Sequence, residues 1–278
     1  MEIIVARHAG VCYGVRRALT LATEAADASA CVKTLGPLIH NPLAVEQLRD
    51  QGIDVADTLD DANHGTLVVR SHGVAPDVID AARAKGLDVV DATCPHVTAV
   101  QEAAGLLARE GYFVIIVGEA DHPEVEGIRG WAGEGAIVVE AVDELPERFG
   151  TRKVGVVVQT TQSVDRLRDI VSALLVRAGE LRVFNTICAA TTLRQESAAD
   201  LAKDVDVVIV VGGHNSGNTT RLAEISRGYN ERVHHVESVD ELDAEWFEGA
   251  ARVGVTAGAS TPEEQIEAVV AAIESFGA

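Results

Sequence analysis

The chain runs through one strand-and-helix pattern three times, and each round places a cysteine between a strand and a helix. The cysteines are Cys12, Cys94 and Cys188, and each follows a short β-branched run and precedes a helix-like stretch. A unit that repeats at intervals of about 90 residues predicts structurally equivalent lobes. Equivalent lobes would bring one thiolate each to a common centre, and three soft ligands at one point make a metal site.

Alternating strands and helices within each unit predict mainly parallel sheets. The expected strands cover 31–36, 65–70, 87–92, 112–118, 136–140, 153–159, 181–187, 205–212, 232–236 and 252–258. The expected helices cover 13–27, 42–51, 76–86, 96–110, 164–177, 190–203, 218–229 and 262–275. The third unit lacks its last strand, whereas residues 2–6 form an unassigned strand that leads into Cys12. We therefore expect residues 2–6 to pair with strands of the third unit.

The predicted fold class is α/β, with three pseudo-threefold-related lobes around a central metal site. Each lobe is expected to be a small, mainly parallel sheet flanked by helices. The lobe boundaries are predicted at 13–93, 94–187 and 188–278, with strand 2–6 completing the third lobe. No linker rich in Pro, Gly and Ser separates the units, so the lobes should pack closely.

Charge and cysteine usage narrow the possible functions. A net charge of −20 argues against nucleic acid or an anionic membrane as the main partner. The start of the chain lacks the features of a signal peptide, and no apolar run reaches membrane-spanning length, which predicts a cytoplasmic protein. In that compartment four cysteines indicate metal ligation or catalysis rather than disulfides. Cys31 matches no repeat position and is interpreted as structural.

A second set of polar residues follows the strands, at the edge where ligands bind in parallel sheets. Twenty-eight residues after each cysteine comes a polar loop residue, namely His40, His122 or Ser216. The candidate pocket residues in these and neighbouring loops are His40, His72, His122, Glu124, Thr160, Ser216, Asn218 and Ser260. Histidines, an amide and hydroxyls provide the hydrogen-bond donors expected around a diphosphate.

Two loops suggest more specific chemistry. The run GGHNSGN lies between a strand and a helix, where glycines let backbone N–H groups approach a phosphate closely. Glu124 would have a raised pKa in a closed site beside an anionic ligand and could deliver a proton, which Thr160 could pass on. From these residues alone, either zinc with a histidine as fourth ligand or an iron–sulfur cluster with one open iron fits the three thiolates.

Together the motifs resemble the 4-hydroxy-3-methylbut-2-enyl diphosphate reductase (LytB) family over essentially the whole chain. The motifs are GVCYGV, IHNP, RSHG, DATCP, DHPEVEG, QTTQ, TICAATTLRQE, NSGNTTRL and TAGAST. The resemblance implies reductive removal of an allylic hydroxyl with two electrons and two protons, which yields isopentenyl and dimethylallyl diphosphate. It also implies a small-molecule allylic diphosphate substrate and ferredoxin or flavodoxin as electron donor. The expectation of no nucleic-acid and no membrane partner rests on the net charge instead.

The resemblance also assigns roles to residues. It implies that Cys12, Cys94 and Cys188 bind a 4Fe-4S cluster with one open iron, which becomes 3Fe-4S when that iron is lost. The implied catalytic residues are Glu124 as proton donor, Thr160 near the substrate hydroxyl, and His122. The implied substrate-binding residues are His40, His72, His122, Thr160, Ser216, Gly217, Asn218 and Ser260. Many members of the family carry a second serine where this chain has Gly217, so a backbone N–H would have to serve there.

Two hypotheses from other classes remain open at this point. One is a zinc-dependent hydrolase of a small phosphorylated substrate, with Glu124 as general base. The other is a non-catalytic iron–sulfur sensor that binds a ligand without turnover. Zinc would leave the protein colourless, whereas an iron–sulfur cluster would make it brown.

Overall fold

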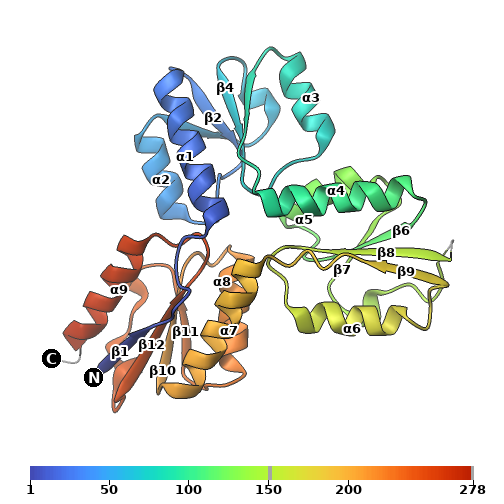
Figure 1. Cartoon of the computed structure of the whole chain (residues 1–278). Coiled ribbons are helices and arrows are strands. Elements are labelled where there is room, and N and C mark those ends of the chain that lie inside the picture. The colour runs from blue at the N-terminus through green and yellow to red at the C-terminus, as the bar shows by residue number, and fades with distance from the viewer. Residues whose placement is uncertain (150–151, 277–278) are drawn as a thin grey trace. The chain divides into compact units, whose positions relative to one another are not determined.

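The structure is a computed structural model that describes residues 1–149 and 152–276. These residues contain three sheets, each of four parallel strands, with helices packed against them (Figure 1). The helices are α1 (Tyr13–Ala28), α2 (Pro42–Asp50), α3 (Pro76–Ala84), α4 (Pro95–Arg109), α5 (Pro123–Ala132), α6 (Val164–Leu174), α7 (Ala189–Asp204), α8 (Gly217–Arg227) and α9 (Glu263–Phe276). Short 3-10 turns lie at Leu59–Asp61, Val142–Glu144, Val239–Glu241 and Ala244–Phe247. The predicted α/β class is confirmed.

The chain divides into two compact units. The first unit comprises residues 1–15, 40–44 and 189–278, and the second comprises residues 16–39 and 45–188. This division does not separate the predicted first and second lobes, because the sheets within residues 32–91 and 113–183 lie in the same unit. The lobe boundaries 13–93, 94–187 and 188–278 therefore stay a prediction.

The sheet of the first unit contains the N-terminal strand. Its order is β1 (Glu2–Val5), β12 (Arg252–Ala257), β10 (Val207–Val211) and β11 (Val233–Val236). Strand β1 pairs in parallel with β12, so that Ile3 lies opposite Val253. Ile3 also packs against the core cluster that contains Val269 and Ile273 of α9. The predicted pairing of residues 2–6 with the C-terminal part of the chain is confirmed.

The second unit contains the other two sheets. One has the order β3 (Ile53–Ala56), β2 (Val32–Leu35), β4 (Thr66–Val69) and β5 (Asp88–Asp91). The other has the order β7 (Ile137–Val139), β6 (Phe113–Val117), β8 (Lys153–Val158) and β9 (Glu180–Val183). All three sheets share the spatial order 2-1-3-4, in which the second strand of each repeat lies at the edge beside the first. In the first unit β1 takes the place of the fourth strand. The threefold repeat of the sequence is therefore also a repeat of sheet topology.

Burial on both faces explains why the central strands are continuous apolar runs. Val207, Ile209 and Val211 of β10 belong to one core cluster, together with α9. Val208 and Val210 belong to the cluster on the opposite face, with α7 and α8. Each fully buried side chain of this size stabilises the fold by about 1.5–3 kcal/mol. Each sheet is thus fixed as a rigid support for the loops at its ends.

The main departures from the predicted elements are β3, α5 and β9. Strand β3 is a four-residue edge strand with an exposed Asp54, so its pattern is too short to detect. Helix α5 contains Gly127 and Gly130, which cost about 1 kcal/mol each relative to alanine in a helix. Strand β9 ends at Val183 rather than continuing to 187. In α5, tertiary contacts outweigh the local sequence preference.

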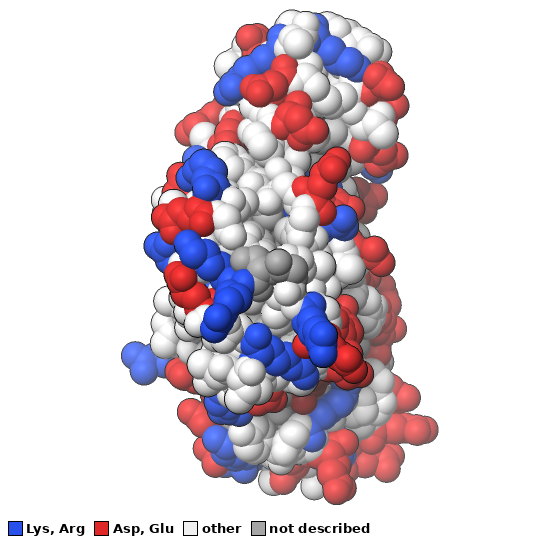
Figure 2. Space-filling model, turned by 90° about the vertical axis from the view of Figure 1, so that its right-hand side faces the viewer, with Lys and Arg blue, Asp and Glu red and all other residues white. Residues whose placement is uncertain are grey.

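The surface of the protein is strongly charged. On the face shown in Figure 2, Lys and Arg side chains lie in groups between Asp and Glu side chains. Such interspersed charge is typical of a solvated surface. None of the described helices has the length and apolar character required to span a membrane.

Candidate active site

The three repeat cysteines occupy equivalent backbone positions. Each is half-buried, and each donates its backbone N–H to a carbonyl two residues beyond the end of the third strand of its sheet. These bonds run from Cys12 to Ala259 (3.0 Å), from Cys94 to Ser71 (2.9 Å) and from Cys188 to Thr160 (3.0 Å). Each cysteine also lies just before a helix N-terminus, where the helix dipole favours a thiolate. The equivalence inferred from the sequence repeat is therefore present in the backbone.

Cys31 lies in a different environment. It comes immediately before β2, at the amino end of the strand, and its thiol donates to the carbonyl of His64 at 3.7 Å. The loops that carry the predicted site residues lie at the carboxyl ends of the strands. Cys31 thus lies at the amino ends of the strands, opposite to the predicted site residues. Its structural role stays a prediction.

The first unit brings together the residues predicted to bind the diphosphate. Ser216 caps α8, and its hydroxyl accepts the backbone N–H of Thr219 at 3.4 Å. Ser260 follows β12, and its hydroxyl donates to the carbonyl of His40 at 2.9 Å. Asn218 is only 5% exposed, and within the described residues its amide oxygen and nitrogen have no hydrogen-bond partner. A buried amide without partners is costly unless a ligand satisfies it.

Two glycines allow the N-terminus of α8 to approach the sheet. A Cβ at Gly258, just after β12, would lie 2.1 Å from the hydroxyl of Thr219. A Cβ at Gly212, after β10, would lie 2.9 Å from the same oxygen, and Gly212 has a φ of +142°. Without these glycines the helix could not sit so close to the strand ends. The first backbone N–H groups of α8, including that of Gly217, therefore lie at the carboxyl ends of the strands, where they could bind an anion.

In the second unit, a buried carboxyl group is held by one threonine. The backbone N–H of Thr160 donates to Oε1 of Glu124 at 2.7 Å, and the Thr160 hydroxyl bonds to Oε2 at 2.8 Å. Glu124 is 2% exposed, and this burial raises its pKa to about 7, although the two Thr160 bonds act in the opposite direction. The negative charge of Glu119 raises the pKa further. Near neutral pH Glu124 can therefore both hold a proton and release it.

Two histidines lie next to this carboxyl group. His122 caps α5, and its Nδ1 accepts the backbone N–H of Glu124 at 3.1 Å. Because Nδ1 is an acceptor, the neutral ring carries its hydrogen on Nε2. The ring of His72 meets that of His122 edge to face, with centroids 5.6 Å apart. Both histidines thus lie next to Glu124.

A continuous series of contacts connects Cys94 with Cys188 through these residues. Cys188 bonds to Thr160, Thr160 bonds to Glu124, and Glu124 bonds to His122. His122 then contacts His72, whose neighbour Ser71 accepts the N–H of Cys94. Within the second unit, the two predicted ligands, the acid and both histidines therefore form one constellation.

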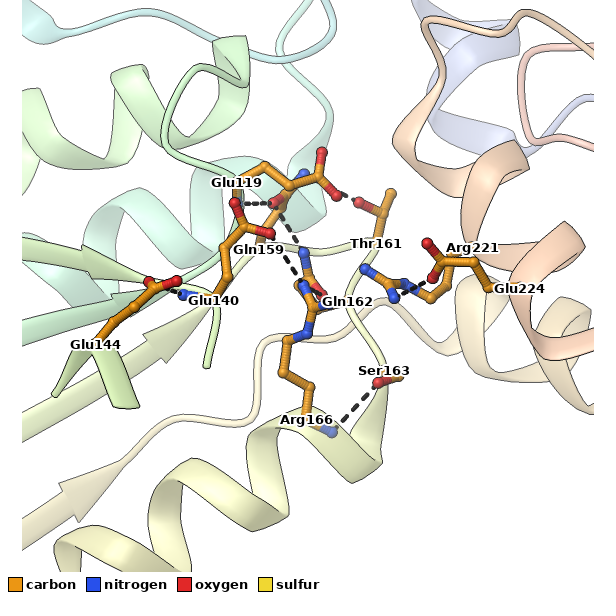
Figure 3. Close-up of polar contacts among 10 residues, drawn as sticks. All are labelled: Glu119, Glu140, Glu144, Gln159, Thr161, Gln162, Ser163, Arg166, Arg221 and Glu224. Atoms are coloured by element: carbon orange, nitrogen blue, oxygen red, sulfur yellow. Dashed lines mark hydrogen bonds and ion pairs between the residues drawn. The ribbon is translucent and has the colours of Figure 1, made fainter. Parts of the chain in front are cut away.

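Two glutamines that the sequence reasoning missed support the Thr160 loop (Figure 3). Gln159 is fully buried, and its Oε1 accepts the backbone N–H of Glu119 at 3.0 Å and the side chain of Gln162 at 3.3 Å. Its Nε2 donates to the hydroxyl of Thr161 at 3.2 Å. Gln159 thereby ties the loop after β6 to the loop after β8. The motif QTTQ, in which two amides bracket the threonines, was the available signal.

Burial of Glu124 predicts a specific pH dependence of stability. Its pKa in the folded protein, about 7, lies above the unfolded value of 4.5, so its favourable contribution is complete below pH 4.5 and is lost as pH rises through 7. Relative to Glu124→Gln, the wild-type free energy of unfolding should fall by about 3 kcal/mol between pH 4.5 and 8. Chemical denaturation of both proteins across this range measures the difference. A difference that does not vary with pH would contradict the raised pKa.

The structure thus groups the predicted residues within each unit separately. The first unit contains the predicted site residues Cys12, His40, Ser216, Gly217, Asn218 and Ser260. The second unit contains Cys94, Cys188, His72, His122, Glu124 and Thr160. Across residues 1–149 and 152–276, no group of three or more His, Cys, Asp or Glu forms a metal site. The metal ligands therefore stay a prediction.

Comparison with known proteins identifies the family. The family model described as "LytB protein" matches residues 3–274. The chain belongs to the LytB family. The resemblance predicted from the motifs is thereby confirmed.

The LytB family members most similar to this chain include curated reductases. The chain is 49% identical to the 4-hydroxy-3-methylbut-2-enyl diphosphate reductase of Pelobacter propionicus over 98% of both chains. It is 47% identical to the enzyme of that name from Aquifex aeolicus, over 99% of this chain and 97% of the relative.

Solved structures agree with this assignment. One, titled as the reductase that is the terminal enzyme of the non-mevalonate pathway, is 47% identical, with a TM-score of 0.73 over 99% of this chain and all of that one. A Plasmodium falciparum reductase is 29% identical, with a TM-score of 0.91 over 97% of this chain and 87% of that one. The similarity to these reductase structures therefore extends over nearly the whole chain.

Proposed function

We propose that this LytB family member is a 4-hydroxy-3-methylbut-2-enyl diphosphate reductase. It removes the allylic hydroxyl reductively and yields isopentenyl and dimethylallyl diphosphate, as the names of its relatives support. The observation that carries the proposal is the buried Glu124, which Thr160 holds at both oxygens beside His122. A carboxyl group with a pKa of about 7 is suited to protonate a leaving hydroxyl at neutral pH.

The hydrogen bonds define how the proton is held. Oε1 of Glu124 must accept in either protonation state, because its partner is the backbone N–H of Thr160. The acidic proton therefore sits on Oε2 and points to the Thr160 hydroxyl, which can pass it to a substrate oxygen. Once Glu124 is ionised, the same hydroxyl turns to donate to Oε2. Both states of the acid are thus satisfied without movement of the backbone.

The donor set around the cysteines suits an iron–sulfur cluster. Residues 3–23, 92–101 and 181–195, which contain the three repeat cysteines, include no Asp or Glu, although the chain has 43 of them. Asp91, three residues before Cys94, is the nearest acidic residue in sequence to any of these thiolates, and its carboxylate is occupied by the backbone N–H and hydroxyl of Thr93. We assign Cys12, Cys94 and Cys188 to a 4Fe-4S cluster with one open iron. When bound, the cluster supplies electrons and Lewis acidity at the substrate hydroxyl.

The remaining residues bind the substrate. In the first unit, the unpartnered amide of Asn218, the hydroxyls of Ser216 and Ser260 and the N–H of Gly217 supply donors for the diphosphate. His40, His72 and His122 supply further donors. The two electrons would come from a small cytoplasmic carrier of the ferredoxin or flavodoxin type.

Replacing Asn218 with alanine tests this binding assignment. The substitution removes two buried polar atoms that pair with ligand alone, so the apparent affinity for substrate should fall by roughly tenfold to a hundredfold. Calorimetry with inorganic diphosphate and steady-state KM measure the effect. Asn63→Ala, which removes an exposed amide in the segment before β4, is the control and should leave binding unchanged. Equal affinities for wild type and Asn218→Ala would exclude Asn218 from the pocket.

An anaerobic purification followed by an assay tests the proposed activity directly. The protein should be brown, contain iron and sulfide, and convert 4-hydroxy-3-methylbut-2-enyl diphosphate when dithionite and methyl viologen supply electrons. A colourless zinc protein that hydrolyses phosphorylated substrates would instead indicate the hydrolase. A cluster-containing protein that binds the substrate without turnover would indicate the sensor.

A further inference from the structure

The segment 70–76 carries His72 and connects β4 to α3. Gly73, next to His72, has a φ of +69°, and its N–H closes a turn onto the carbonyl of Arg70 at 3.0 Å. The segment is therefore a tight loop whose position depends on what packs against it. Its neighbours are α4 and α5, the helices that begin beside Cys94 and Glu124.

Two donors from these helices converge on one carbonyl oxygen of the loop. The indole Nε1 of Trp131 lies 3.3 Å from the carbonyl oxygen of Val74, and Nε2 of Gln101 lies 3.5 Å from it. Gln101 is a buried amide, only 3% exposed. Val74 is two residues beyond His72, so these two bonds hold the backbone close to His72.

The two donors have matching positions on their helices. Gln101 lies seven residues after Cys94, and Trp131 lies seven residues after Glu124. Seven residues make about two helical turns, so each donor shares a helix face with the functional residue at the N-terminus. One carbonyl therefore connects the helix of a predicted ligand, the helix of the acid and the loop of a histidine.

Glycines make the approach close enough for these bonds. A Cβ at Gly73 would lie 2.4 Å from Nε2 of Gln101, and one at Gly127 would lie 3.1 Å from the same atom. A Cβ at Gly130 would lie 2.2 Å from that of Ala75. The Gln101 amide thus fits between two backbones that carry no side chains. Such a fit holds the loop in one position relative to both helices.

We propose that Gln101 and Trp131 are positioning residues, which clamp the Val74 carbonyl and so set the contact of His72 with His122. The function of this clamp rests on the proposed reductase activity, but its geometry does not. Loss of either donor frees the loop, and the His72 ring then moves relative to His122 and Glu124. Misplacement of about 1 Å near reacting groups can lower a rate by about a hundredfold.

Gln101→Met and Trp131→Phe test the clamp, because each removes the donor but preserves most of the packing. In holoenzyme, kcat should fall by roughly tenfold or more, and KM should change less than kcat, since His72 and His122 are only part of the proposed substrate contacts and the residues of the first unit are untouched. Gln101→His, which restores a ring N–H, should regain most of the lost kcat. Gln47→Met on the exposed face of α2 and Trp246→Phe are the matched controls and should behave as wild type.

A second measurement is independent of turnover. Ring ¹⁵N spectra of the histidines should show signals of His72 and His122, assigned with His72→Gln and His122→Gln, that shift in both clamp variants and not in the controls. Unchanged spectra and unchanged kcat in both variants would overturn the proposal. If wild type lacks reductase activity, the proposed function fails, whereas the spectra still decide whether the clamp positions His72.

Discussion

Serine in place of Cys12, Cys94 or Cys188 should each abolish the iron–sulfur absorption and reduce turnover to background. A neutral serine hydroxyl binds cluster iron much more weakly than a cysteine thiolate does. Loss of one of the three protein ligands therefore leaves the cluster weakly bound. All three variants should therefore fail alike, although Cys12 lies in the first unit and the other two in the second. Visible spectra and iron and sulfide content of anaerobically purified proteins measure the loss.

Cys31→Ser is the matched control for this experiment. Cys31 is also half-buried, but its thiol bonds to a backbone carbonyl at the amino end of β2, which a hydroxyl can replace. Its cluster content and turnover should stay near those of wild type. Equal loss in Cys31→Ser would contradict the equivalence of the three repeat positions.

The sheets could be predicted because the pattern of apolar residues and the threefold repeat of the sequence indicate the same strands. The short, valine-rich run VDVVIVVG favours a strand buried on both faces, and β10 is fully buried over Val207–Val211. The repeat supplied what local pattern could not, namely the partner of the N-terminal strand. Three units with the same strand order left one vacant edge position, and β1 occupies it beside β12.

Helix α5 could not be predicted, because its stability comes from tertiary contacts. Gly127 and Gly130 weaken it locally, but they allow it to approach segment 70–76 at distances that a side chain would prevent. His122 stabilises its N-terminus by accepting the N–H of Glu124. The helix is therefore stabilised by its packing against segment 70–76. The glycines that lower its local helix propensity also permit this packing.

The chemically distinctive residues of the site were predictable, and their supports were not. Cys94, Glu124 and Thr160 stand out because their side chains and repeat positions suggest chemistry. Gln101 and Gln159 are ordinary amides in sequence, and their importance follows from burial and from the separate segments that they join. Residues that act on a ligand can be recognised from the sequence more readily than residues that only position other residues.

Glutamine in place of Glu124 should lower turnover by about 10²–10⁴-fold while substrate binding stays close to that of wild type. The amide keeps the size of the carboxyl group, and its oxygen can still accept the N–H of Thr160, so the backbone of the site should not move. Only the transferable proton is lost. Single-turnover kinetics with reduced enzyme, together with substrate affinity, separate chemistry from binding.

The pH profile and a matched variant complete the test. In wild type, kcat should decline as pH rises above about 7, because Glu124 then ionises and no longer donates a proton. Glu134→Gln removes an exposed carboxylate two residues beyond the end of α5. That variant should retain both the rate and the pH profile of wild type. Ordinary turnover in Glu124→Gln, or the same decline above pH 7 in that variant, would remove Glu124 from the role of acid.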